Sequence, residues 1–167
     1  MTRTRVLIQV LAMAGALSIS LAAIAAGTHA GGHGGSHGDG HQMAAAIGKP
    51  GSPAKVSRTI EIDMTDAMRF TPGEIQVKAG ETVRFKVTNS GKIRHEMVLG
   101  TEADLNGHYQ MMLKDPGMRH DEPNSVSLEA GKSGEIVWQF SKAGRVAFAC
   151  LEPGHYPAGM KGTVSVK

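Results

Sequence analysis

Short runs in which apolar and polar residues alternate fill the chain from Ser57 onward, and they constrain its fold more than any other feature. In the first run, Ile60 and Ile62 alternate with Glu61 and Asp63. A side-chain period of two is typical of strands with one buried face. Seven or eight such strands, separated by turns, predict an all-β Greek-key β-sandwich. The other apolar runs are Ile75 and Val77; Val83, Phe85 and Val87; Ile136, Trp138 and Phe140; Val146 and Phe148; and Gly162 to Val166.

The segment 101–124 interrupts this pattern. It lacks alternation, and it contains the turn-forming sequences Asp104-Leu105-Asn106-Gly107 and Asp115-Pro116-Gly117. A segment of this length is long for a loop and usually carries function or a short helix of its own. We therefore expect an irregular or short-helical insert near 101–124.

The first 25 residues have the composition of an export signal. Arg3 and Arg5 precede the apolar run Val6–Leu21, and Ala23-Ile24-Ala25 then fits the small-x-small cleavage rule. An uncleaved membrane anchor is the alternative, because residues 6–26 are long enough to span a bilayer. We expect cleavage, and with it export and no stable insertion in the membrane.

A glycine-rich tract, residues 26–56, follows the signal and predicts a disordered tail before a folded domain at 57–167. So many glycines oppose helix formation, because ordering each one costs backbone entropy. The tract either offers imidazoles for weak metal binding or is a solvated spacer, and the constant spacing of its histidines favours metal binding. These histidines are His29, His33, His37 and His41.

Composition excludes several classes of function. A single Cys excludes an intramolecular disulfide, a Cys₄ zinc or iron–sulfur site and a two-Cys binuclear copper centre within one chain. The formal charge is only +3, and the basic residues do not cluster, so no nucleic-acid partner is expected. His and Met are abundant, at eight and ten residues, and both are metal ligands.

Three of these potential ligands lie in one loop between the last two predicted strands. Cys150, His155 and Met160 have the spacing Cys-x4-His-x4-Met, and His95 follows an earlier strand. A thiolate, two imidazoles and a weak axial thioether together suit copper in both its oxidation states. Alone, each residue is more simply explained by packing or by surface exposure. Zinc fits Cys and two His, but it leaves the thioether without a purpose.

The same stretch resembles the cupredoxins, the small blue copper proteins. The resemblance covers about 57–167 and rests on Val146-Ala147-Phe148-Ala149-Cys150, Pro153-Gly154-His155 and Gly159-Met160-Lys161-Gly162. It implies an eight-stranded Greek-key sandwich with one type 1 copper ion, held by His95, Cys150, His155 and Met160. The length of the loop is similar to that of the subgroup that includes rusticyanin and auracyanin.

One position departs from the family pattern. Many cupredoxins have Asn directly after the first histidine ligand, where it helps to tie the two ligand loops together. This chain has Glu96 there, within Arg94-His95-Glu96-Met97. Glu96 either takes over that bonding or faces solvent.

A second cluster of possible copper ligands lies in the insert. Thioethers select Cu(I), so an additional Cu(I) site is one interpretation, and packing of the methionines over the sandwich is the other. The cluster comprises His108, Met111, Met112, Met118 and His120.

The combination of a His-rich tail, a Met- and His-rich insert and one copper domain resembles the CopI-type periplasmic copper-tolerance cupredoxins of Gram-negative bacteria. This resemblance implies a periplasmic protein that binds, sequesters or transfers copper, with a redox or copper-transfer protein as partner. The alternative is a soluble one-electron carrier of the plastocyanin, azurin or auracyanin kind. An enzyme is not expected, because a copper oxidase or nitrite reductase needs a second, catalytic copper.

Overall fold

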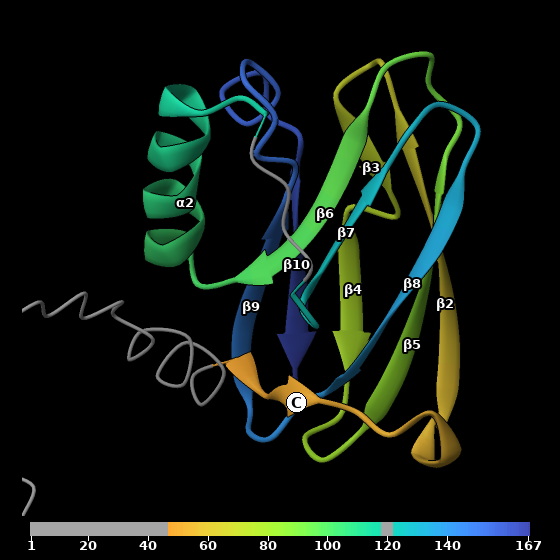
Figure 1. Ribbon diagram of the computed structural model, residues 1–167. Coiled ribbons are helices and arrows are strands. Elements are labelled where there is room, and N and C mark those ends of the chain that lie inside the picture. The colour runs from red at the N-terminus through yellow and green to blue at the C-terminus, as the bar shows by residue number, and fades with distance from the viewer. Residues whose placement is uncertain (1–46, 118–121) are drawn as a thin grey trace, which may run out of the picture. The chain divides into compact units, whose positions relative to one another are not determined.

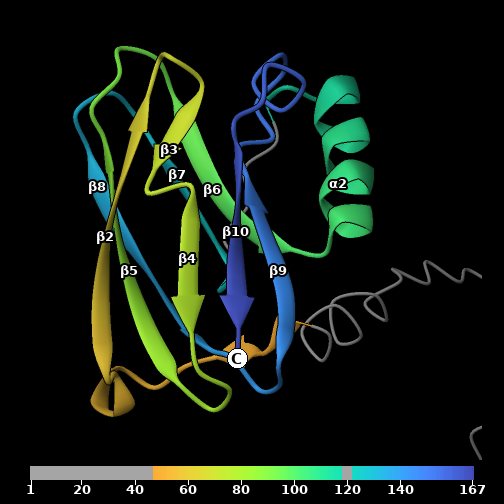
Figure 2. The same ribbon diagram turned by 180° about the vertical axis from the view of Figure 1, so that it is seen from behind.

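Two five-stranded β-sheets and one 13-residue helix make up the part of the chain that the structure describes, residues 47–117 and 122–167 (Figure 1; Figure 2). The structure is a computed structural model. The export signal and the four tail histidines lie outside these residues and stay predictions. Within the described residues, no helix is long and apolar enough to cross a membrane.

Each sheet combines strands that follow one another in the chain with strands that are distant in the sequence. Strands β2 (Arg58–Thr65) and β3 (Arg69–Thr71) form an antiparallel pair joined by a short turn. The pairs of β2 with β5 (Thr82–Asn89) and of β4 (Glu74–Val77) with β10 (Lys161–Val166) are parallel, so the chain crosses between the sheets to form them. Helix α2 spans Glu102–Lys114, and the short 3₁₀ helix η1 spans Pro53–Lys55. One sheet has the order β1 (Lys49–Pro50), β8 (Ser133–Gln139), β5 (Thr82–Asn89), β2 (Arg58–Thr65), β3 (Arg69–Thr71). The other has the order β4 (Glu74–Val77), β10 (Lys161–Val166), β9 (Gly144–Ala149), β6 (His95–Gly100), β7 (Ser125–Leu128).

This architecture confirms the predicted all-β sandwich with a helical insert. The described strands number ten, against the seven or eight expected. Two of them, β1 and β3, have only two and three residues, which is too few to produce a visible alternation. The insert is helical over Glu102–Lys114.

Alternation along the strands fills the space between the sheets with apolar side chains. In β5, Val83, Phe85 and Val87 are fully buried, while Arg84 between them is only half-buried. The ring of Phe85 meets that of Phe140 edge to face, with 6.1 Å between centroids. Edge-to-face contacts of this kind add to the free energy that burial of the rings supplies.

Strand β6 is buried on both faces, because α2 covers the side that faces away from the sandwich core. Met97 and Leu99 belong to the core between the sheets. Val98 points the other way and packs with Leu105 and Met112 of the helix. Both views show α2 alongside β6 and β9. A strand covered on both faces carries no polar face, so it shows no alternation.

Helix α2 begins at a capping box. The hydroxyl of Thr101 accepts the backbone N–H of Asp104 at 3.2 Å, and the Asp104 carboxylate accepts the backbone N–H of Thr101 at 3.3 Å. These bonds satisfy two N–H groups that have no partner inside the helix. The acidic residues of the first turn, Glu102 and Asp104, also oppose the positive end of the helix dipole.

Residues 47–56, predicted from the sequence as part of the tail, lie on the sandwich. Ile47 is buried, and its carbonyl accepts the indole N–H of Trp138 at 3.0 Å. Gly48 has a φ of 120°, and a Cβ there would lie 2.2 Å from the carbonyl oxygen of Gln139. Strand β1 then pairs with β8. A single apolar residue among small and polar ones gives no period to read, so the sequence did not indicate this contact.

Candidate metal centre

Three predicted ligands converge at one end of the sandwich. His95 is the first residue of β6, Cys150 directly follows β9, and His155 lies in the loop between β9 and β10. Strands β6 and β9 are antiparallel neighbours, so the start of one lies near the end of the other. The loop after β9 is at the end of the sandwich opposite the C-terminus (Figure 1; Figure 2).

The donor atoms of these residues lie close enough together to share one ion. The Nδ1 atoms of His95 and His155 are 3.2 Å apart, and Sγ of Cys150 is 3.3 Å from Nδ1 of His155. One ligand atom from each of the three residues lies within 4.8 Å of the others. Two donors at about 2.0–2.3 Å from a shared metal are separated by at most about 4.6 Å. Both measured separations satisfy this limit.

Burial shifts the pKa of two of these groups, the Cys150 thiol and the His155 imidazole. His95 and Cys150 are fully buried, and His155 is partly exposed. Burial raises the pKa of the Cys150 thiol to about 12, despite the N–H of Glu96 that points at Sγ from 3.4 Å. The thiolate therefore needs a bound cation to form at neutral pH. Burial, together with neighbouring His95, lowers the pKa of His155 and favours the neutral imidazole that binds metals.

One thiolate and two imidazole nitrogens form the donor set that copper takes in electron-transfer sites, where a weak thioether completes it. A comparison with protein families decides the assignment. Residues 56–167 match the copper-binding proteins of the plastocyanin/azurin family. The chain belongs to this family. Its His95, Cys150 and His155 are thus consistent with the ligands of a type 1 copper.

Two curated relatives of this cupredoxin carry the same name. The copper-resistant cuproprotein CopI of Rubrivivax gelatinosus is 53% identical over 127 residues, which cover 76% of this chain and 77% of the relative. CopI of Pseudomonas aeruginosa is 43% identical over 151 residues and covers 73% of this chain and 83% of the relative. The resemblance to CopI-type cupredoxins is confirmed.

Solved structures with the same fold include the auracyanins. Auracyanin A, a blue copper protein of Chloroflexus aurantiacus, aligns with a TM-score of 0.56 and 27% identity over 65% of this chain and 98% of its own. Auracyanin B aligns with a TM-score of 0.57 and 25% identity over 67% and 90% of the two chains. These neighbours confirm the cupredoxin fold.

The loop between β9 and β10, residues 150–160, is called the ligand loop below. Met160, the predicted axial ligand, lies at its end and is fully buried. Its N–H donates to the carbonyl of His155, and its carbonyl accepts the N–H of Cys150, both at 3.1 Å. The loop therefore folds back so that its last ligand lies beside its first. Gly154 and Gly159, with φ of 87° and 91°, supply the left-handed turns that this path requires.

Glu96 joins the two segments that carry the ligands. It is buried, and its Oε1 accepts the backbone N–H of Leu151 at 2.9 Å. Its own N–H points at Sγ of Cys150. Of the two alternatives for this departure from the family pattern, the structure supports the one in which Glu96 replaces the bonding of the asparagine. Burial raises the pKa of Glu96 to about 7, although the bond from Leu151 opposes that shift.

An ion pair ties the ligand loop to the residue before His95. Arg94 Nε lies 2.6 Å from Glu152 Oε1, and Arg94 Nη2 lies 2.9 Å from Glu152 Oε2, which is a two-point contact. The hydrogen bond to Glu152 raises the pKa of Arg94 further. Arg94 also donates to the carbonyl of Pro116 at 3.3 Å, so it links the insert to the site.

Two further contacts hold the ligand loop from outside. The hydroxyl of Tyr109, on α2, accepts the N–H of Gly154 at 3.3 Å. Arg69, on β3, donates to the carbonyl of Ala158 at 3.1 Å. The rings of Tyr109 and Tyr156 also meet, with 5.4 Å between centroids. Contacts from several elements thus hold the loop, and such a rigid loop would limit the rearrangement of a copper ion bound there when it gains or loses an electron.

The described residues of the second predicted cluster lie on α2 and differ in their burial. Met112 is fully buried on the face of α2 that packs on the sandwich, as the packing interpretation expects, whereas Met111 on the same helix is 49% exposed. His108 lies on the same helix and is partly exposed. Met118 and His120 lie outside the described residues. An additional Cu(I) site in the insert stays a prediction.

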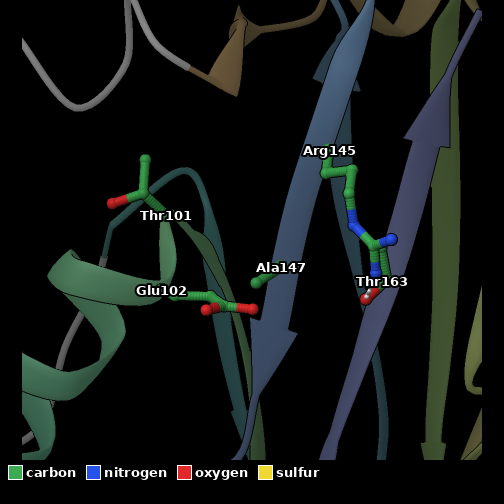
Figure 3. Close-up of a pocket in the computed structure, with 5 residues that line it drawn as sticks. All are labelled: Thr101, Glu102, Arg145, Ala147 and Thr163. Atoms are coloured by element: carbon green, nitrogen blue, oxygen red, sulfur yellow. Dashed lines mark hydrogen bonds between the residues drawn. The ribbon is translucent and has the colours of Figure 1, made fainter.

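A shallow hollow of about 220 Å³ lies away from the metal centre, between the start of α2 and strands β9 and β10 (Figure 3). On the sheet side of the hollow, Arg145 of β9 reaches toward Thr163 of the neighbouring β10, with 3.5 Å from Nη2 to Oγ1 (Figure 3). It shares no residue with the three-ligand cluster. The hollow is lined by Thr101, Glu102, Arg145, Ala147 and Thr163.

Sequence reasoning missed several residues that position the ligands. Asp66 contacts His95 from the turn between β2 and β3, and it reads only as a turn residue. Asn89 is fully buried and donates to the carbonyls of Ile93 and Leu128, at 2.8 and 2.9 Å. An isolated polar residue at the end of an alternating strand signals a turn, and nothing in its spacing indicates a partner 39 residues away.

Proposed function

We propose that this cupredoxin binds copper through His95, Cys150, His155 and the axial Met160, and that it serves in periplasmic copper tolerance by sequestering or transferring copper. The observation that carries the proposal is the convergence of three soft and borderline donors within 4.8 Å of one another. The likeness to two copper-resistant cuproproteins supports the physiological role.

The location and the partner follow from the export signal predicted at residues 1–25. An exported copper protein meets copper ions first in the periplasm, and its partner is a redox or copper-transfer protein of that compartment. We assign no catalytic turnover, since the single Cys supplies one thiolate and therefore one type 1 copper. Copper in such a site takes up and releases one electron.

Substitution of Cys150 tests the site. Cys150→Ser removes the thiolate, so the intense thiolate-to-Cu(II) absorption in the visible range disappears from the copper-loaded protein. Met160→Leu changes the position or intensity of that band, whereas Met111→Leu, at an exposed position, leaves it unaltered. A visible band that survives Cys150→Ser overturns the ligand assignment.

Growth on copper tests the role. Expression of the chain in a copper-sensitive bacterium should raise the copper concentration that the cells tolerate, and Cys150→Ser should reduce this gain. Copper bound per chain is measured in the same preparations, with and without residues 26–46. This deletion spares Ile47 and β1, which pack on the sandwich. Sequestration by the tail predicts more than one equivalent of copper, falling when the tail is removed.

A one-electron carrier is the second candidate, and the partial exposure of His155 favours it, because this ligand offers an electron a short path to the surface. One equivalent of copper with and without residues 26–46, no gain in copper tolerance and rapid electron exchange with a small redox protein would favour the carrier over the tolerance role.

A further inference from the structure

A carboxylate contacts the buried ligand His95 on the side of the ring away from the metal centre. Oδ1 of Asp66, in the turn between β2 and β3, lies 3.0 Å from Nε2 of His95. Nδ1 of the same ring lies 3.2 Å from Nδ1 of His155. An imidazole whose one nitrogen binds a metal carries its proton on the other nitrogen, and here that other nitrogen, Nε2, faces a carboxylate.

We propose that Asp66 is a positioning residue for the copper site: it accepts the Nε2–H of His95, directs Nδ1 at the metal and stabilises the Cu(II) state. The inference rests on copper as the metal of this site and is independent of whether copper is stored, transferred or used for electron transfer.

Asp66 is itself held in place by the turn that leads to His95. The backbone N–H of Lys92 donates to both carboxylate oxygens, at 2.8 and 3.1 Å, and that of Ile93 reaches Oδ1 at 3.5 Å. A Cβ on Gly91 would lie 2.1 Å from Oδ1, so any other residue there would displace the carboxylate from this position.

The opposite side of this turn is held independently. The side-chain N–H₂ of Asn89 donates to the carbonyl of Ile93 at 2.8 Å, and its oxygen accepts the N–H of Gly91 at 2.9 Å. The turn is therefore supported by Asn89 as well as by Asp66. The contact between Asp66 and His95 is separate from this support, because it does not involve the turn.

The charge of Asp66 gives the contact an electronic effect. A carboxylate that accepts Nε2–H makes the imidazole a stronger donor, and a stronger donor favours Cu(II) over Cu(I). The Asp66 side chain is 38% exposed, so water and salt screen its field at longer range. The effect on copper is therefore transmitted mainly through the hydrogen bond to the ring.

Three variants of the copper-loaded full chain separate this role from a general effect of charge. Asp66→Asn keeps an oxygen that can accept the His95 proton but removes the charge, and Asp66→Ala removes both. Asp63→Asn is the matched control, because it removes the same charge from β2 at a carboxylate that contacts Ser90 rather than a ligand.

Reduction potentials are measured for all three variants. Outer partners of metal ligands typically change metal affinity by about 10–100-fold. We expect Asp66→Ala to weaken Cu(II) binding at least tenfold relative to Cu(I), which corresponds to a rise of about 59 mV for one electron. Asp66→Asn should raise the potential by less, and Asp63→Asn by least.

Hydrogen exchange gives a readout that does not depend on the potential. The Nε2–H of His95, followed by ¹⁵N NMR in the diamagnetic Cu(I) form, should be protected in the wild type and Asp66→Asn and exchange faster in Asp66→Ala. If Asp66→Ala does not fold, the wild type and Asp66→Asn still decide the question. Equal potentials in Asp66→Asn and Asp63→Asn, with an unprotected Nε2–H in the wild type, overturn the inference. If the copper-loaded wild type shows no thiolate-to-Cu(II) band, the assignment of the copper site is wrong, which is a different outcome from failure of the role of Asp66.

Discussion

At the scale of single residues, Glu96 shows how a carboxylate can serve in an apolar setting. It is buried, and its side chain accepts the N–H of Leu151 in the ligand loop. Burial disfavours the charged carboxylate, which is why the pKa of Glu96 rises to about 7. The oxygen that meets Leu151 can accept the bond in either protonation state, so the link between the ligand segments does not depend on the charge.

This link predicts different outcomes for two substitutions. Glu96→Gln retains an oxygen for the N–H of Leu151, so its free energy of unfolding should stay within about 1 kcal/mol of the wild type. Glu96→Ala leaves that N–H unpaired in a buried position, which costs about 1–3 kcal/mol. Urea denaturation of the copper-free chains measures both. An Ala variant as stable as the Gln variant contradicts the proposed link.

The limits of the sequence are also visible at single residues. Cys150 and His155 were predictable from their spacing and chemistry within one loop, and His95 from its place after a predicted strand and from the resemblance to cupredoxins. The partners of these ligands were not, apart from Glu96, whose bonding role was one of two alternatives left open. Glu96 and Asp66 act across 55 and 29 residues of chain, and a contact at such separation depends on strand register, which spacing alone does not show.

At the scale of elements, the ligand loop depends on contacts with the segment that precedes β6. The Arg94–Glu152 pair is largely buried, with 18% and 11% of the two side chains exposed. By contrast, the Lys86–Glu61 pair between neighbouring strands is 56% and 67% exposed. Water screens the second pair far more than the first.

A double-mutant cycle on each pair measures this difference. For Arg94→Ala with Glu152→Ala, we expect a coupling free energy of about 1–3 kcal/mol, as for residues in one partly buried contact. For Lys86→Ala with Glu61→Ala, the coupling should stay below about 1 kcal/mol. Unfolding in urea gives both values. Equal couplings would show that the Arg94 contact adds nothing to the stability of the loop.

Helix α2 predicts a second contrast, between two leucines. Leu105 is 2% exposed and packs with Val98 and Leu151, whereas Leu113 is 47% exposed. Leu105→Ala should reduce the free energy of unfolding by about 2–5 kcal/mol because it leaves a cavity. Leu113→Ala should change it by at most about 0.5 kcal/mol. Similar losses in both variants would mean that α2 does not pack as described.

Some secondary-structure elements were easier to predict from the sequence than others. Strands such as β5, with one buried face, were visible through alternation. Strand β6 was not, because α2 covers its outer face and every residue from His95 to Gly100 is buried. The helix itself was expected only as one of two alternatives, an irregular or a short-helical insert, since its buried residues Leu105, Tyr109 and Met112 include few strongly apolar side chains.

At the scale of the whole molecule, copper binding and folding are coupled. A ligand that binds only the folded state stabilises it, by about 4 kcal/mol at a thousandfold excess over its dissociation constant. The melting temperature of the copper-loaded chain should therefore exceed that of the chelator-treated chain, and Cys150→Ser should reduce the difference. Trp138, the single tryptophan and 2% exposed, reports unfolding by fluorescence. Identical melting curves with and without copper would contradict this coupling.

The ligand loop has a practical consequence for protein design. Three of the four proposed ligands lie between Cys150 and Met160, so a designer who grafts this segment onto another sandwich transfers almost the whole donor set in one step. The graft leaves behind the carboxylate on β6, the guanidinium before it, the tyrosine on α2 and the arginine on β3 that grip the segment. The ligands can thus be transferred as one segment, but the recipient protein must supply new contacts that hold this segment in place.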